Sequence, residues 1–210
     1  MSVDQADKKS KRVRLSDSDL LLLKVICVGG AATEDYADNL VGDRRVRTLI
    51  KKGILKKNDP YYDENRKNKN GHLKKLNSLS LDTRGGEEVI KRGFCNKLQG
   101  YNGYIHTEQT QKIVEDLLVN KNIPVEKIFN EKEQQDIFRH QIYQAEAEGI
   151  DFAINDIAYY DLDGNLHSVE IETNYKKELV LKHKNYAEKV LNVRYESHSY
   201  NSPKKRRRWF

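Results

Sequence analysis

The most apolar stretch of the sequence, LLLLKVICVGGAA at residues 20–32, limits what the chain can fold into. Lys24 interrupts it, and it is shorter than the roughly 20 residues that cross a bilayer. We therefore expect a buried helix in a cytoplasmic protein that has no membrane partner. Ser16 is placed to cap this helix and Gly29-Gly30 to end it. Since 33% of all residues are charged, the core around the helix has to be small.

The two cysteines, Cys27 and Cys95, lie far apart in the sequence and do not form a CxxC pair. Their spacing argues against a disulfide scaffold or a zinc ribbon, and it fits a reducing compartment. The length of 210 residues allows one large domain or two small ones.

Helical and strand patterns alternate through the first half of the chain. In the third predicted helix, Val46, Leu49 and Ile50 have the spacing of one buried stripe, and the arginines fall mostly off it. After the first helix we predict these elements in order: a helix from Thr33 to about Leu40, a helix over 43–52, a strand over 54–57, a polar loop over 58–72, a strand over 73–81 and a helix over 83–92.

This order of elements resembles a winged helix-turn-helix domain, which we place at residues 12–98. The resemblance implies that the third helix enters the major groove of double-stranded DNA, while the polar loop contacts phosphates or the minor groove. A winged helix that binds proteins remains the alternative. The predicted DNA-binding residues are Arg44, Arg45, Arg47, Lys51, Arg66, Lys67 and Lys69.

Charge is divided unevenly along the chain. Residues 43–75 contain 12 Lys or Arg and 4 Asp or Glu, whereas residues 108–188 contain 9 and 17. A basic first half suits a polyanion, and an acidic second half does not suit a second large phosphate-binding face. Both ends carry basic runs, at 8–14 and 204–208, and we expect residues 1–11 and 201–210 to be basic, flexible tails.

The sequence pattern of the second half predicts a sheet flanked by helices. After a linker at 100–104 we predict a helix capped by Thr107, a strand over 150–160, a turn at 161–165, a strand over 166–173, a helix over 177–190 and a final strand over 192–197. Three carboxylates fall on the two central strands: Asp156, Glu170 and Glu172. They are either a metal-binding group or the solvent-facing side of a sheet. We expect their oxygens to converge on one point.

The spacing of these carboxylates, D-x13-E-x-E, resembles the core of PD-(D/E)xK nucleases. The resemblance implies a PD-(D/E)xK-like α/β domain over 105–200 in which Asp156 and Glu170 hold Mg²⁺ or Mn²⁺. It further implies Asp156, Glu170, Glu172 and Lys177 as catalytic residues. Glu172 stands where that family usually has Lys. The predicted fold class is α+β, a winged helix-turn-helix followed by this α/β domain.

Both halves together resemble the replication-relaxation proteins of plasmids and integrative elements. The matching motifs are Asn155-Asp156-Ile157, Glu170-Ile171-Glu172, and Lys177 with Tyr186 on the following helix. The resemblance implies a DNA-binding protein of a plasmid, phage or integrative element that acts in DNA mobilisation, replication or its regulation. Its partners would be double-stranded DNA and other mobilisation or replication proteins, and a homodimer stays open. The alternative is a divalent-metal-dependent DNA endonuclease.

Overall fold

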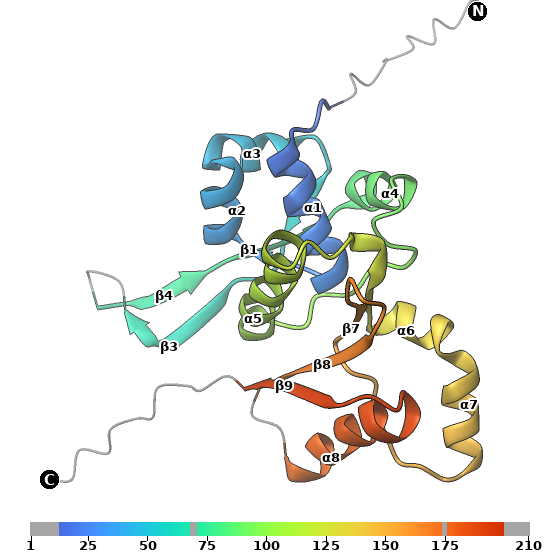
Figure 1. The fold of residues 1–210 in the computed structure, drawn as a ribbon. Coiled ribbons are helices and arrows are strands. Elements are labelled where there is room, and N and C mark those ends of the chain that lie inside the picture. The colour runs from blue at the N-terminus through green and yellow to red at the C-terminus, as the bar shows by residue number, and fades with distance from the viewer. Residues whose placement is uncertain (1–12, 68–70, 174–175, 200–210) are drawn as a thin grey trace, which may run out of the picture.

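The computed structural model describes residues 13–67, 71–173 and 176–199, and it has the mixed α+β character that the sequence predicts. Figure 1 shows the first half of the chain in the upper part of the molecule and the second half below it. The first half contains α1 (Asp17–Gly29), β1 (Ala32–Thr33), α2 (Glu34–Val41), α3 (Asp43–Lys51), β2 (Leu55–Lys57), β3 (Tyr61–Lys67), β4 (Leu73–Leu76), β5 (Ser78–Leu81) and α4 (Thr83–Lys91).

The predicted capping residues begin and end the first helices. Ser16 Oγ accepts a hydrogen bond from Asp19 N, and the Asp19 carboxylate accepts one from Ser16 N, so the two residues form a capping box. Gly30 ends α1 with φ of 80°, a left-handed conformation that favours glycine. Thr33 caps α2 as predicted.

Two predictions for the region between α3 and α4 are wrong. The stretch predicted as a polar loop contains β3, which pairs antiparallel with β4. The strand predicted over 73–81 is divided at Asn77, because Asn77 binds α2 instead: its Nδ2 donates to Glu34 Oε2 at 2.6 Å, and its carbonyl accepts from Glu34 N at 2.9 Å. β5 then lies between β1 and β2 in a three-stranded sheet.

The second half is built on a four-stranded sheet in the order β6-β7-β8-β9, with only the β8–β9 pair parallel. Its elements are α5 (Tyr104–Glu115), a π-helical turn (Asp116–Asn120), a 3₁₀ turn (Val125–Lys127), β6 (Ile128–Asn130), α6 (Glu131–Ile137), α7 (Arg139–Ala147), β7 (Ile157–Tyr160), β8 (Leu166–Glu172), α8 (Lys177–Asn185), a second π-helical turn (Tyr186–Val190) and β9 (Tyr195–Ser199).

Here too, two predicted boundaries are corrected. α5 begins at Tyr104, and Thr107 does not cap it, because the Thr107 hydroxyl lies inside the helix and donates to Gly103 O at 2.8 Å. The strand predicted over 150–160 is confined to β7 at 157–160. Residues 151–156 do not continue β7, because their backbone groups bind α8 instead: Ala153 N donates to Lys182 O at 3.2 Å, and Asp151 O accepts from Asn185 Nδ2 at 2.8 Å.

One apolar core runs through both halves of the molecule. Buried residues of α1, such as Leu22 and Ile26, belong to the same cluster as Ile157 and Val169 of the second sheet. α5 lies against α1 (Figure 1). Gln111 of α5 also accepts a hydrogen bond from the backbone of Thr33 at 2.8 Å. In the described residues no helix is long and apolar enough to cross a membrane.

Candidate nucleic-acid interface and acidic pocket

Three cations share the exposed face of α3. Arg44, Arg47 and Lys51 are exposed and have the i, i+3, i+7 spacing of one helix face. Val46 and Leu49 are buried on the other side of the helix. Arg47 makes an exposed ion pair with Asp43 at 2.7 Å, which holds the side chain only weakly. This face of α3 therefore presents guanidinium and ammonium groups to solvent.

Arg45, which the sequence groups with these cations, is engaged within the protein. Its Nη2 lies 2.6 Å from Oδ2 of the fully buried Asp19, and its Nε lies 3.0 Å from Oδ1. Nη2 also donates to the carbonyl of Arg14 at 2.7 Å. Burial opposes the charge of Asp19, but hydrogen bonds from Arg45 and Ser16 outweigh it and lower the pKa of the carboxyl. Arg45 therefore positions α3 on α1.

The β3–β4 ribbon extends from the body of the first half (Figure 1). Tyr62, Leu73, Lys74 and Lys75 are exposed on it. Of the predicted DNA-binding residues of this region, Arg66 and Lys67 belong to β3, and Lys69 lies outside the described residues.

Asp156 and Glu170 meet at one end of the second sheet. Asp156 N donates to Glu170 Oε2 at 3.1 Å, and Ile171 N donates to Asp156 Oδ2 at 2.9 Å, so each carboxylate binds the backbone of the other strand region. Only 1% of Glu170 is exposed. The hypothesis that this glutamate lies on the solvent side of a sheet is therefore wrong, and the pair forms part of a polar interior.

Two histidines flank this pair. Neither could be predicted from the sequence, because they come from helices that are distant in the chain. His106 Nε2 of α5 lies 2.8 Å from Asp156 Oδ1. His183 Nδ1 of α8 lies 3.2 Å from Glu170 Oε2 and 3.1 Å from Asn155 Oδ1. Burial lowers the pKa of His183, although Asp156 acts in the opposite direction.

These groups line a pocket with a volume of about 600 Å³. The lining residues are Asn102, His106, Glu131, Ala153, Ile154, Asp156, Glu170, Thr173, Leu179 and His183. Two predicted residues lie elsewhere: the Glu172 carboxylate accepts a hydrogen bond from Tyr195 Oη at 3.0 Å, and Lys177 is exposed at the start of α8. Within the described part of the chain, no group of three or more His, Cys, Asp or Glu side chains is arranged to hold a metal ion.

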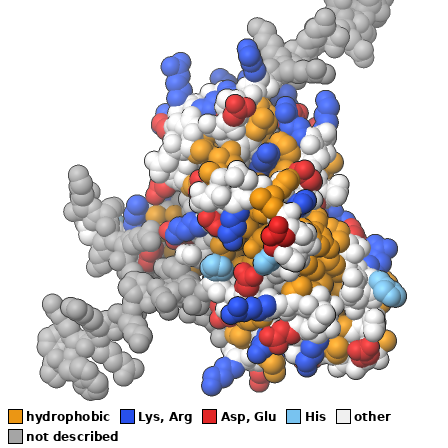
Figure 2. All heavy atoms as spheres, in the orientation of Figure 1, with side chains coloured by type: hydrophobic (Ala, Val, Ile, Leu, Met, Phe, Trp, Pro, Cys, Tyr) orange, Lys and Arg blue, Asp and Glu red, His pale blue; other side chains and the backbone are white. Residues whose placement is uncertain are grey.

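The base of the β3–β4 ribbon adjoins this pocket. The rings of Tyr61 and Tyr104 stack with centroids 5.8 Å apart. Tyr104 is the first residue of α5, two positions before His106. Figure 2 shows acidic and histidine side chains beside Lys and Arg side chains near the middle of the face that it displays. The base of the ribbon is thus held against the start of α5, the helix that carries His106.

A third histidine, His167 of β8, links β7, β8 and β9. His167 lies between two carboxylates, with Nε2 3.0 Å from Asp161 and Nδ1 2.9 Å from Glu196, and its ring stacks on Tyr159. Burial opposes the charge on His167, but the hydrogen bonds to Glu196 and Asp161 prevail and raise its pKa. The His167 contact in turn lowers the pKa of Asp161.

We expect the free energy of unfolding to fall as the pH rises through the raised pKa of His167. Because the folded state holds this proton more tightly, its stabilising effect is complete below the unfolded pKa of about 6.5 and is lost above the folded pKa. The His167→Gln variant should lose this part of the pH dependence in urea titrations from about pH 6 to pH 9. Exposed His140 supplies the control His140→Gln. An unchanged pH profile in His167→Gln would contradict this assignment.

Comparisons of the chain with protein-family models, with curated proteins and with solved structures find no match. The geometry of the α3 face and of the acidic pocket is therefore what supports a function.

Proposed function

We propose that this protein binds double-stranded DNA, with α3 in the major groove and the β3–β4 ribbon against the sugar-phosphate backbone. The observation that carries this proposal is the row of exposed cations on α3, Arg44, Arg47 and Lys51; the ribbon adds exposed Lys74 and Lys75. The proposal is further supported by the resemblance of the element order from α1 to α4 to a winged helix-turn-helix, a fold in which the third helix reads DNA. A role in DNA mobilisation, replication or its regulation in a mobile element, together with other proteins of that process, belongs to the same proposal.

Direct titration tests DNA binding. A fluorescently labelled duplex should bind with a dissociation constant in the micromolar range or below at about 50 mM salt, and log affinity should fall linearly with log salt. An excess of unlabelled duplex should displace the label. If no duplex binds at low salt, DNA binding is excluded and a protein-binding winged helix takes its place.

The acidic pocket supports a second candidate, a DNA endonuclease dependent on Mg²⁺ or Mn²⁺. Two observations support this candidate: β7 and β8 form a hairpin in a sheet flanked by helices, and Asp156 and Glu170 meet at the end of that hairpin. Carboxylate oxygens are the ligands that these ions prefer. Asp156 and Glu170 would hold the ion, which would activate water near the DNA backbone. Glu172 and Lys177 do not line the pocket.

Plasmid nicking separates the two candidates. A nuclease should convert supercoiled plasmid to the open-circular form in Mg²⁺ or Mn²⁺, and Asp156→Asn should abolish this conversion, because it removes the anionic ligand. Asp151→Asn is the matched control, since the Asp151 side chain is 72% exposed and lies outside the pocket. Nicking that survives in Asp156→Asn would assign the activity to a contaminant, and absence of nicking leaves DNA binding as the proposed function.

A further inference from the structure

We infer that one face of the β3–β4 ribbon is a stacking surface for an unpaired DNA base, so that the protein prefers duplex DNA with an adjoining single-stranded segment. The inference rests on the proposed DNA binding and extends it to the form of DNA that is bound. Three side chains make up this stacking face: Tyr62 of β3, and Leu73 and Lys75 of β4. All three are exposed, with exposed fractions of 52% for Tyr62 and 43% for Leu73.

The strand register places these side chains together. Tyr62 pairs with Lys75, and residues directly opposite each other in an antiparallel pair project to the same face. Leu73 stands two positions before Lys75 in β4, so the alternation along a strand puts it on that face too. Tyr62 and Leu73 are then diagonal neighbours, whose Cβ atoms lie about 7–8 Å apart, within reach of an aromatic side chain. An aromatic ring, an aliphatic side chain and an ammonium group therefore form one small patch.

The opposite face of the ribbon is attached to the body of the protein. Tyr61 and Leu76, which also pair across the ribbon, lie on that opposite face. The Tyr61 ring stacks on Tyr104 with centroids 5.8 Å apart, and Leu76 is only 3% exposed. Lys74 reaches α2 from the same side, with its Nζ 3.9 Å from Asp35 Oδ2. These contacts fix the orientation of the ribbon, which extends from the body in Figure 1, and they turn its stacking face to solvent.

The chemistry of the stacking face selects an unpaired nucleotide as its ligand. Aromatic rings bind bases by stacking, which tolerates any base sequence, and a neighbouring ammonium group neutralises the phosphate. In an intact duplex each base is covered above and below by its neighbours, and only its edges are open in the grooves. The Tyr62 ring can therefore stack only on a base that has left the duplex or lies in a single strand.

A second copy of the chain does not fit the same face. A stable interface buries about 800 Å² of each partner, and two half-exposed side chains supply only a small part of that area. Two copies that met here around a twofold axis would also bring their Lys75 ammonium groups together, and like charges directly opposite each other are destabilising. A single nucleotide needs no such area, and its phosphate complements the ammonium group.

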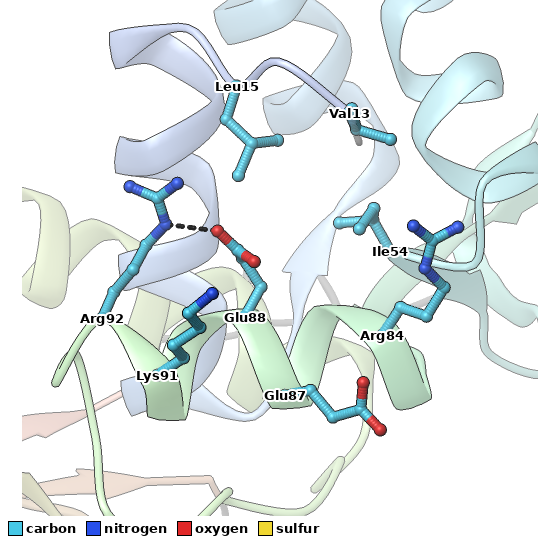
Figure 3. Close-up of a pocket in the computed structure, with 8 residues that line it drawn as sticks. All are labelled: Val13, Leu15, Ile54, Arg84, Glu87, Glu88, Lys91 and Arg92. Atoms are coloured by element: carbon cyan, nitrogen blue, oxygen red, sulfur yellow. Dashed lines mark hydrogen bonds and ion pairs between the residues drawn. The ribbon is translucent and has the colours of Figure 1, made fainter. Parts of the chain in front are cut away.

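A pocket of about 370 Å³ beside α4 supplies a control for the charge of Lys75. Figure 3 shows acidic and basic side chains of α4 alternating along the wall of this pocket. Glu88 pairs there with Arg92 at 2.6 Å, and Glu87 lies one turn before Lys91. Because acids accompany its cations, this wall is a poor phosphate site, and removal of Lys91 should not affect DNA binding.

The experiment compares two labelled DNAs that share one duplex sequence. One is blunt, and the other carries a single-stranded tail of about 10 nucleotides, within the site sizes of single-strand-binding folds. The wild-type chain should bind the tailed DNA about 5- to 150-fold more tightly, the gain expected from stacking one base. Tyr62→Ala should lose this preference, and Tyr62→Phe, which keeps the ring, should retain most of it. Tyr143→Ala is the matched control, because Tyr143 is 62% exposed on α7 of the second half.

Two further readouts separate stacking from charge. A 2-aminopurine base in the tail loses fluorescence when it stacks, so the wild-type chain and Tyr62→Phe should quench it and Tyr62→Ala should not. Lys75→Gln should weaken binding of the tailed DNA and lower the slope of log affinity against log salt by about 0.7, the value for one single-strand phosphate contact. Lys91→Gln should leave both quantities unchanged.

The outcomes are distinct. Equal affinity of the wild-type chain for blunt and tailed DNA overturns the stacking face and leaves the proposed function in place. A preference for tailed DNA that Tyr62→Ala keeps in full assigns the preference to charge and also overturns the stacking face. A dimer in sedimentation velocity that Tyr62→Ala dissociates would give this face to a second copy, against the inference. Absence of binding to either DNA overturns the proposed function and the inference together.

Discussion

Asp19→Ala should lower the free energy of unfolding by about 3–5 kcal/mol, a large part of the stability of a domain of this size. The carboxylate is fully buried and accepts hydrogen bonds from Arg45 and from Ser16 N. Its removal leaves the partly buried Arg45 charge without its partner. It also breaks the capping box of α1, which alone costs about 0.5–2 kcal/mol.

Urea titration followed by circular dichroism measures this loss. Asp17→Ala is the matched control, because Asp17 is an exposed acid in the same first turn of α1 and contributes only its interaction with the helix dipole, about 0.3–1 kcal/mol. Asp19→Asn should fall between the two, since the amide keeps one acceptor oxygen but not the charge. Equal midpoints for Asp19→Ala and Asp17→Ala would show that the Arg45 pair contributes nothing.

The combined substitution of Arg44, Arg47 and Lys51 by Ala should reduce duplex affinity by at least about 100-fold, because each lost contact costs about 1–3 kcal/mol. All three side chains are exposed, so the fold should keep its urea midpoint. Arg45 is left in place, because its removal would mix loss of stability with loss of binding.

The control for this variant removes the same charge from the second half. Lys176, Lys189 and Arg194 are exposed there, and their combined substitution by Ala should change affinity by less than about threefold. Anisotropy titrations at one salt concentration compare the two variants. If the two variants lose affinity equally, binding depends on the net charge of the protein and α3 is not the DNA-binding surface.

In the first half, the ends of α1 and α2 were predictable from the sequence, whereas the pairing of β3 with β4 was not. Ser16, Thr33 and Gly30 act on the nearest turn of backbone, so the ends of α1 and α2 follow from the residues themselves. β3 has no apolar alternation, and it is a strand only because β4 supplies its hydrogen-bond partners. The end of β4 depends on Glu34, which is 43 residues away from Asn77.

Of the acidic pocket, only the meeting of two carboxylates on neighbouring strands was predictable from the sequence. The hairpin between β7 and β8 brings Asp156 and Glu170 together, as their spacing indicates. His106 and His183 reach the same point from α5 and α8, across 50 residues to Asp156 and 28 residues to Asn155. The direction of Glu172 toward Tyr195 depends on β9, which joins β8 by a parallel crossover that spacing does not reveal.

The core shared by the two halves makes ligand binding and unfolding one linked equilibrium. Buried residues of α1 and of the second sheet lie in a single cluster, so the second sheet cannot open without exposing the packing of the helix that supports α3. A ligand that binds only the folded state lowers the population of every opened form by the same mass-action factor. DNA held at α3 would therefore slow amide hydrogen exchange in β7 and β8, strands that the ligand does not touch.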